Sequence, residues 1–163
     1  MKDGFTQDFI DRVQSTLSEV SIAEMEKVVQ TLKRAYENGK TVFVIGNGGS
    51  AASASHLACD LRYADKKHRR FRVMCLNDNT SLLTALANDL GYEEVFKGQL
   101  QQLVNPGDVV VALSVSADSA NVVKAAEFAR QKGAVVVGFF GSGGGKAHSV
   151  VDLHVTVSDD DFP

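Results

Sequence analysis

Cysteine is scarce in this chain: Cys59 and Cys75 are its only two thiols in 163 residues. Two cysteines so far apart in sequence form neither a C-x-x-C pair nor a disulfide framework, which excludes a small disulfide-stapled secreted domain. We therefore expect both side chains to be small buried hydrophobes and the protein to be cytoplasmic, in a reducing compartment.

We also expect neither a membrane span nor a signal peptide. No apolar run approaches the ~20 residues that cross a bilayer, and Asp3 and Asp8 stand where a signal peptide would be basic. The net charge of -3 argues against a general nucleic-acid surface. We expect no membrane partner and no direct nucleic-acid partner. The basic cluster at 66–70 is either a solvated loop or a rim that attracts an anionic substrate.

The nucleotide-binding motifs are incomplete. A Rossmann turn needs G-x-G-x-x-G, but Gly46 and Gly48 are not followed by a third glycine at the required position. A P-loop needs a lysine followed by Ser or Thr, and in the glycine-rich stretch 141–146 the lysine is followed by Ala147. Both nucleotide interpretations are therefore disfavoured.

Two turns instead place small polar residues directly after β-branched runs. Residues 42–50 read VFVIGNGGS, and residues 109–119 read VVVALSVSADS. Glycines let backbone N–H groups approach an anion, serine hydroxyls add donors, and a following helix N-terminus adds partial positive charge. One such turn alone is more often a plain strand-to-helix connection. Two of them indicate a shared site for one phosphate ester.

Strand and helix patterns alternate along the chain. Amphipathic helices are predicted at 5–19 and 22–36, the second with Ser21 as its N-cap. Alternation with continuous apolar strands predicts an α/β domain with a doubly wound parallel sheet, whose carboxyl edge carries both turns. We expect one domain, with a helical region at 1–38 and an α/β core at 39–163. Its strands are predicted at about 41–46, 72–76, 109–114, 134–139 and 152–157, and its other helices near 50–63, 79–90, 92–104, 118–132 and 143–149.

Four motifs follow one another in order: Gly46-Asn-Gly-Gly-Ser50, Ala87-Asn-Asp89, Pro106-Gly-Asp-Val109 and Ser114-x-Ser-x-x-Ser119. From about residue 20 to 158 the chain resembles the sugar isomerase (SIS) domain, and most closely the phosphoheptose isomerase branch of that family. The resemblance implies a five-stranded parallel sheet, a phosphorylated sugar as ligand, and a homo-oligomer, commonly a tetramer, with active sites between subunits.

The resemblance also assigns residues. His56 matches a histidine that ligates zinc, and Asp60 stands where the family has a glutamate that serves catalysis and metal binding. A spacing of four residues places the two on one helix face, so zinc is a possible cofactor. The implied substrate-binding residues are Asn47, Gly48, Gly49 and Ser50 in the glycine turn (46–50), Asn88 and Asp89, and Ser114, Val115, Ser116 and Ser119 in the serine loop (114–119).

The chain departs from the family pattern at three places. Val115 replaces the usual threonine, and Ala117-Asp118 replaces the usual Gly-Asn. The Asp118 carboxylate would be unfavourable beside a phosphate unless it is turned away. Asp60 is one methylene shorter than the usual glutamate. These changes put the standard substrate in doubt, and not the fold.

The expected chemistry is an aldose–ketose isomerisation through an enediol, from sedoheptulose 7-phosphate to D-glycero-D-manno-heptose 7-phosphate in lipopolysaccharide precursor synthesis. Asp60 is the candidate base and His56 would hold zinc or polarise the sugar oxygen. A carboxylate with an ordinary pKa of about 4 is a weak base, so this hypothesis requires partial burial. His68, His148 and His154 have weaker claims, and His154 is expected to be structural.

A non-catalytic role is the alternative, because some SIS proteins are phosphosugar-binding regulatory modules or scaffolds that bind the replication initiator. His56 with Asp60 favours the enzyme, whereas the altered serine loop favours a scaffold or another phosphosugar. The family pattern also continues after the fifth strand with a helix that supplies a glutamine and a histidine. We therefore expect these 163 residues to be part of a longer protein, and to form by themselves an incomplete, metal-poor and inactive site.

The N-terminal helices carry more apolar side chains than one small domain is expected to cover. A large apolar patch left exposed usually marks an interface, so these helices predict a homo-oligomer. The side chains concerned are Phe5, Phe9, Val13, Leu17, Ile22, Met25 and Val29.

Overall fold

The computed structural model describes residues 4–63, 71–142 and 144–158. The basic cluster at 66–70 and His68 lie outside the described residues, so the interpretation of that cluster as a rim stays a prediction.

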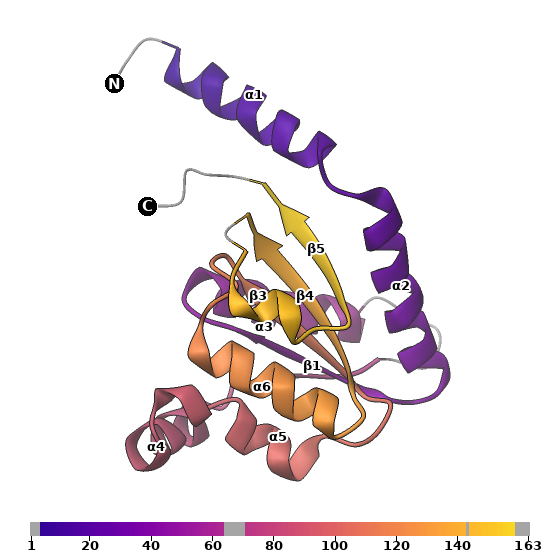
Figure 1. Cartoon of the computed structure of the whole chain (residues 1–163), viewed down its shortest axis with the longest axis vertical. Helices are drawn as coiled ribbons and strands as arrows, with labels where there is room; N and C mark the ends of the chain where they lie inside the picture. The colour runs from indigo at the N-terminus through magenta and orange to yellow at the C-terminus, as the bar shows by residue number, and fades with distance from the viewer. Residues whose placement is uncertain (1–3, 64–70, 143, 159–163) are drawn as a thin grey trace.

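Five parallel strands form one sheet in the order β2-β1-β3-β4-β5. The central strands are continuous apolar runs because both of their faces are covered, and Val44 for example pairs with Cys75 on one side and Val111 on the other. The predicted α/β fold with a five-stranded parallel sheet is confirmed (Figure 1). The strands are β1 (Thr41–Gly46), β2 (Arg72–Cys75), β3 (Val109–Ser114), β4 (Val135–Gly141) and β5 (Leu153–Val157).

The helices agree with the sequence pattern except at two places. The described α-helices are α1 (Phe5–Ser18), α2 (Ile22–Glu37), α3 (Gly49–Tyr63), α4 (Thr80–Leu90), α5 (Lys97–Leu103) and α6 (Ala120–Gln131). As predicted, the Ser21 side chain caps α2 by accepting a hydrogen bond from the Glu24 N–H at 3.3 Å.

Two predicted helices are wrong in extent. The helix expected at 92–104 is a 3-10 turn, η1 (Tyr92–Glu94), followed by the short α5, and the fully buried Val95 and Phe96 lie between them. Core packing sets this break, which helical periodicity does not encode. The helix expected at 143–149 is only the 3-10 turn η2 (Lys146–Ser149), because Gly144 adopts a left-handed φ of 60°.

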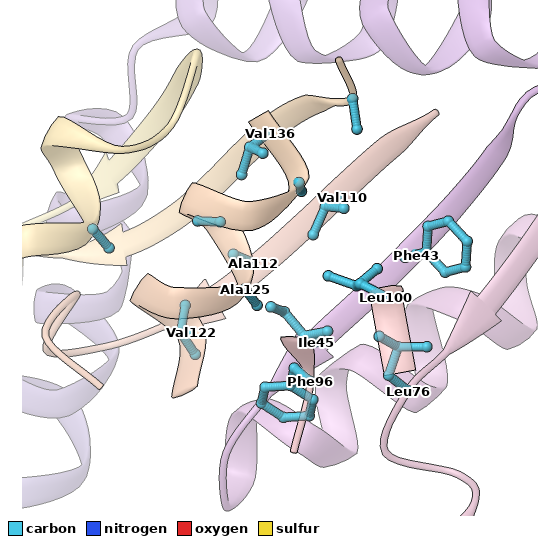
Figure 2. Close-up of a cluster of buried hydrophobic side chains, with 14 of the residues drawn as sticks. Phe43, Ile45, Leu76, Phe96, Leu100, Val110, Ala112, Val122, Ala125 and Val136 are labelled. Atoms are coloured by element: carbon cyan, nitrogen blue, oxygen red, sulfur yellow. The ribbon is translucent and has the colours of Figure 1, made fainter. Parts of the chain in front are cut away.

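Alternate residues of the strands pack into two separate hydrophobic cores, one on each face of the sheet. Phe43 and Ile45 of β1 point into the core that α5 and α6 cover, as Figure 2 shows together with Leu100 and Val122. The intervening Val42 and Val44 of β1 belong to the second core, under α2 and α3. This arrangement is the doubly wound sheet that the sequence predicts.

The first helix is not packed on this body. No residue of α1 is buried, and α1 extends away from the sheet in Figure 1. Its large apolar side chains remain exposed, namely Phe5, Phe9, Ile10, Val13 and Leu17. Across the described residues, no helix is both long and apolar enough to cross a membrane.

The two cysteines differ in environment. Cys75 on β2 is buried as expected, and burial raises the pKa of its thiol to about 11, which keeps it in the unreactive protonated form. The expectation for Cys59 is wrong, because this α3 side chain is exposed. The Cys59 thiol is therefore solvent-accessible and does not act as a core hydrophobe.

Two histidines meet edge to face beside β4 and β5. The rings of His148 in η2 and His154 in β5 lie 4.8 Å apart, and Phe140 packs against both. The Nε2 atom of His148 is buried without a hydrogen-bond partner. Burial first, and then the neighbouring His154, lowers the pKa of His148 below its ordinary value. Half-buried His154 is thus part of the packing, in line with the structural role predicted for it.

We expect the free energy of unfolding to fall as the pH drops below about 6.5, the pKa of an unfolded histidine. The lowered folded-state pKa of His148 means that the unfolded chain binds a proton that the folded chain does not. Stability is therefore lost between the unfolded and the folded pKa, by at most about 1.4 kcal/mol per pH unit for one group. Urea titrations at several pH values measure this slope. His148→Leu should flatten the slope and His56→Asn, at an exposed site, should not; an unchanged slope in His148→Leu contradicts the assignment.

Candidate active site

The predicted ligand-binding turns are neighbours at the carboxyl edge of the sheet. β1 pairs with β3 from Val42 opposite Val109 to Gly46 opposite Leu113, so both strands end side by side. The strand order also reverses here, since β2 lies on one side of β1 and β3 on the other. Ligands of doubly wound sheets bind at such a switch point.

The glycine turn leaves its backbone accessible. Gly48 adopts a left-handed φ of 52°, which favours glycine, and α3 begins at Gly49. A Cβ atom added at Gly48 or Gly49 would meet no described atom within 4 Å. The half-buried Ser50 follows in the first turn of α3, where helix N–H groups have no intrahelical partner. Open space beside free N–H groups suits an anionic ligand.

The serine loop connects β3 to the N-terminus of α6. Ser114 is buried at the end of β3, Ser116 is exposed, and Ser119 occupies the N-cap position of α6. The Ser119 side chain makes no capping hydrogen bond, so its hydroxyl is free to meet a ligand. Together with the positive end of the 12-residue α6 dipole, these hydroxyls have the chemistry to bind an anion.

Two backbone carbonyls of the serine loop accept hydrogen bonds from Gly141 and Ala147. The Gly141 N–H donates to the Val115 carbonyl at 3.0 Å, and the Ala147 N–H donates to the Ala117 carbonyl at 2.8 Å. A Cβ atom at Gly145 would lie only 2.3 Å from the Ala117 oxygen. Gly141 and Gly145, two glycines of the stretch that mimics a P-loop in the sequence, therefore pack against the serine loop, a role that sequence reasoning missed.

We expect Gly145→Ala to lower the free energy of unfolding by about 1–3 kcal/mol through overpacking, and to weaken phosphosugar binding because the serine loop must move. Gly144→Ala is the matched control: a Cβ atom there meets no described atom within 4 Å, so only its left-handed φ is strained. Denaturant titration and calorimetric ligand titration measure the two effects. Equal ligand affinity in both variants would show that the packing does not shape the loop.

Two of the three sequence departures lie in this loop. Ala117 is the only described non-glycine residue with a positive φ, 51°, at a position where glycine avoids the strain. The Asp118 carboxylate lies 3.4 Å from the Lys146 N–H and 3.8 Å from its Nζ atom, so it is held by η2. The Asp118 carboxylate, expected to oppose a phosphate unless turned away, is thus paired with an exposed lysine, while the Val115 side chain is exposed and adds no donor.

Asn88 and Asp89 lie in the last turn of α4 as an exposed pair, with the Asn88 amide donating to the Asp89 carboxylate at 2.8 Å. Asn47, the first residue of the turn after β1, bonds through its side chain to Tyr92 and Asn121. Neither partner was singled out by sequence reasoning. One signal was available for Asn121: it is an amide on the apolar stripe of α6 that buries Val122, Ala125, Ala126 and Ala129.

His56 and Asp60 stand on one face of α3, with Nε2 and Oδ2 3.7 Å apart. The helical rise places them about 10 Å and 16 Å along α3 from its first residue, away from the serine loop. Their side chains are 78% and 64% exposed. The partial burial that a base would need is therefore not supplied by the described residues of one chain.

These two residues alone do not fit a tightly held zinc ion. Zinc sites use three or four protein ligands, and nowhere among residues 4–63, 71–142 and 144–158 do three His, Cys, Asp or Glu side chains gather as a metal site. The pair can supply two ligands, and a complete site needs at least one more from elsewhere.

Comparison with known proteins identifies the family. The sequence profile of the SIS domain matches residues 7–141. Phosphoheptose isomerase of Geotalea daltonii is 40% identical over 153 residues, which are 93% of this chain and 80% of the relative. Phosphoheptose isomerase of Rhodospirillum rubrum is 48% identical over 145 residues, covering 88% of this chain and 75% of the relative.

Solved structures agree with this fold. A phosphoheptose isomerase from Francisella tularensis superposes with a TM-score of 0.91 at 24% identity, covering 99% of this chain and 89% of its own. The enzyme from Neisseria gonorrhoeae gives a TM-score of 0.83 at 29% identity, covering 95% and 82%. The chain therefore belongs to the SIS-domain family and, through these relatives, to its phosphoheptose isomerase branch.

Proposed function

We propose that this protein is an isomerase that interconverts sedoheptulose 7-phosphate and D-glycero-D-manno-heptose 7-phosphate, in the synthesis of heptose precursors of lipopolysaccharide. One observation carries the proposal: the glycine turn and the serine loop follow paired strands, so both lie at the β1–β3 edge, where their donors would bind one anion. The relatives named phosphoheptose isomerase support the same activity.

Phosphate binding would anchor the substrate at the end remote from the reaction. Ser114, Ser116 and Ser119 offer hydroxyl donors, and the first N–H groups of α3 and α6 add partial positive charge. An anchored phosphate fixes where the carbonyl end of the sugar lies, and binding energy at the remote group then helps to orient the reacting carbons.

The isomerisation moves hydrogen and leaves the composition of the sugar unchanged. A base removes a proton from C1 of the ketose, next to the C2 carbonyl, while the carbonyl oxygen gains a proton to give the enediol. The O1 hydroxyl then loses its proton as C2 gains one, which leaves an aldehyde at C1. We assign the carbon proton transfers to Asp60, and charge stabilisation at the sugar oxygen to His56.

Zinc belongs to the proposal as a possible cofactor, with His56 and Asp60 as two of its ligands. When bound, the ion would act as a Lewis acid on a sugar oxygen. Because the described residues provide only this pair, the remaining ligands must come from other residues or from another subunit. A neighbouring subunit over α3 would also supply the burial that Asp60 lacks.

The exposed apolar side chains of α1 support a homo-oligomer. The family resemblance favours a tetramer. We expect Leu17→Glu to dissociate it, because a charge on an apolar interface is desolvated without a partner. Light scattering at micromolar concentration measures the mass, with Glu127→Gln on the exposed face of α6 as control. A wild-type protein that already scatters as a monomer would contradict this.

A cytoplasmic location is proposed with the same function, since the exposed free thiol of Cys59 suits a reducing compartment.

Product analysis of the full-length protein with sedoheptulose 7-phosphate, fructose 6-phosphate and unphosphorylated sedoheptulose tests the function. Turnover of the first substrate alone supports it. Tight binding of phosphosugars with turnover of none would favour the alternative, a non-catalytic phosphosugar-binding module.

A further inference from the structure

Three segments that carry the assigned substrate residues meet at one hydrogen-bonded cluster. Asn47 lies in the glycine turn, Tyr92 stands three residues after Asp89, and Asn121 stands two residues after Ser119. These residues are 45 and 74 positions apart from Asn47 in sequence, and their side chains touch. We call this cluster of Asn47, Tyr92 and Asn121 the amide node.

Every polar atom of the Asn47 side chain is used in this node. Its Nδ2 donates to the Asn121 Oδ1 at 2.9 Å, and its Oδ1 accepts from the Asn121 Nδ2 at 2.9 Å. The same Oδ1 accepts from the Tyr92 hydroxyl at 3.0 Å. A reciprocal amide pair holds both side chains in one orientation, so one N–H and the carbonyl oxygen of the Asn47 side chain are engaged within the protein, and its second N–H is held in a fixed direction.

Burial makes this pair expensive to disturb. Asn121 is 2% exposed and sits on the core-facing stripe of α6. A buried amide that loses its partner costs about 1–3 kcal/mol. The position of the glycine turn is thereby coupled to the start of α6, the helix that follows the serine loop.

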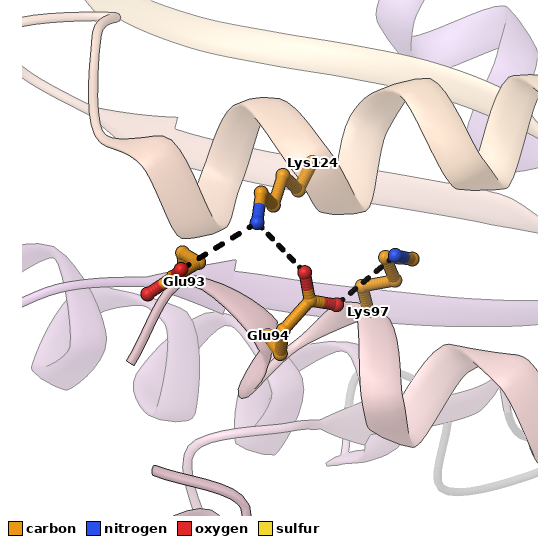
Figure 3. Close-up of polar contacts among 4 residues, drawn as sticks. All are labelled: Glu93, Glu94, Lys97 and Lys124. Atoms are coloured by element: carbon orange, nitrogen blue, oxygen red, sulfur yellow. Dashed lines mark hydrogen bonds and ion pairs between the residues drawn. The ribbon is translucent and has the colours of Figure 1, made fainter. Parts of the chain in front are cut away.

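A second tether on α6 holds the segment that carries Tyr92. Lys124, three residues after Asn121, lies 2.7 Å from Glu94 and 3.7 Å from Glu93. Figure 3 shows both contacts. Lys97 meets the other Glu94 oxygen at 3.0 Å. Hydrogen bonds from Lys124 and Lys97 lower the pKa of Glu94, which keeps it charged. Lys124 of α6 thus holds η1 at the Glu93 and Glu94 carboxylates, and the amide node holds η1 at Tyr92.

We propose that Asn121 and Tyr92 are positioning residues of the active site, which act through Asn47 to set the distance between the sugar end and the phosphate end of the bound substrate. The inference rests on the proposed function. The glycine turn, the Asn88–Asp89 pair and the serine loop come from separate parts of the chain, and within the described residues the node is the hydrogen-bonded contact shared by their three segments. Displacement of one segment by about 1 Å can cost about 100-fold in rate.

The test compares kcat and KM in Tyr92→Phe, Asn121→Ala and the double variant. We expect Tyr92→Phe to lower kcat about 5-fold and Asn121→Ala about 100-fold, with KM changed less than 3-fold, because the phosphate contacts remain. The double variant should match Asn121→Ala, since both act through one amide. Tyr36→Phe is the matched control, a ring packed on Phe71 far from the edge, and should keep the parental kcat.

Tyr92 is 52% exposed, so Tyr92→Phe is expected to fold even if Asn121→Ala does not. The inference would be overturned if Tyr92→Phe and the folded fraction of Asn121→Ala both kept the parental kcat per folded molecule. It would also be overturned if the losses in kcat of the two single variants added fully in the double variant. Backbone hydrogen exchange gives a readout without turnover: segments 47–50 and 88–92 should exchange faster in both variants and not in Tyr36→Phe. A parent that does not isomerise sedoheptulose 7-phosphate removes the proposed function, while exchange still decides whether the node couples the segments.

Discussion

Asp60→Asn is expected to lower kcat at least ~100-fold while phosphosugar affinity and the fold stay unchanged. The amide keeps the shape of the side chain and removes the proton acceptor. Because Asp60 is 64% exposed, the substitution disturbs no core contact, and its effect reports chemistry and not folding. Steady-state kinetics with a calorimetric binding titration separate kcat from affinity.

Glu127→Gln is the control for this variant, since Glu127 is an exposed carboxylate on α6. It should keep the parental kcat. If Asp60→Asn isomerises at the parental rate, the base is another residue. A loss of affinity with unchanged kcat would instead make Asp60 a substrate-binding residue.

Replacing Ser114 and Ser119 together by alanine should weaken phosphosugar binding about 100-fold. A hydrogen bond to a charged group contributes about 1.5–3 kcal/mol, so two such bonds reach the ~3 kcal/mol that corresponds to two decades in Kd. The Ser119 hydroxyl makes no capping bond in the free chain, so its removal leaves α6 intact.

Ser18→Ala, on the exposed end of α1, is the control for the double variant. Its affinity should equal that of the parent. The kcat of the double variant at saturating substrate should fall less than its affinity, because the phosphate lies away from the reacting carbons. Unchanged affinity in Ser114→Ala/Ser119→Ala would remove the serine loop as the phosphate site.

Local patterns were sufficient to predict the sheet and its carboxyl edge. Buried strands such as Val109–Ser114 are continuous apolar runs, and serines or glycines follow them, so both the fold and the meeting of the two turns could be predicted. The α5 break was missed because Val95 and Phe96 are placed by tertiary packing.

The site was only partly predictable, because several of its contacts join distant residues. The Asn47–Asn121 pair spans 74 positions, and the contact of Gly145 with Ala117 depends on how two loops cross. Asp118 was expected to oppose a phosphate, and only the structure reveals its Lys146 partner. The roles of His56 and Asp60 came from the family resemblance alone, and the expected C-terminal continuation of the chain stays a prediction.

Carbon-13 NMR of the full-length protein with sedoheptulose 7-phosphate labelled at C2 tests the proposed isomerisation most directly. The reaction must convert that carbon from the hemiketal carbon of a ketose to a secondary alcohol carbon of an aldose. We expect the alcohol signal to grow until ketose and aldose reach equilibrium, and to do so about 100-fold more slowly with Asp60→Asn. A label that stays at the hemiketal carbon while the folded wild-type protein binds the sugar would contradict the isomerase assignment.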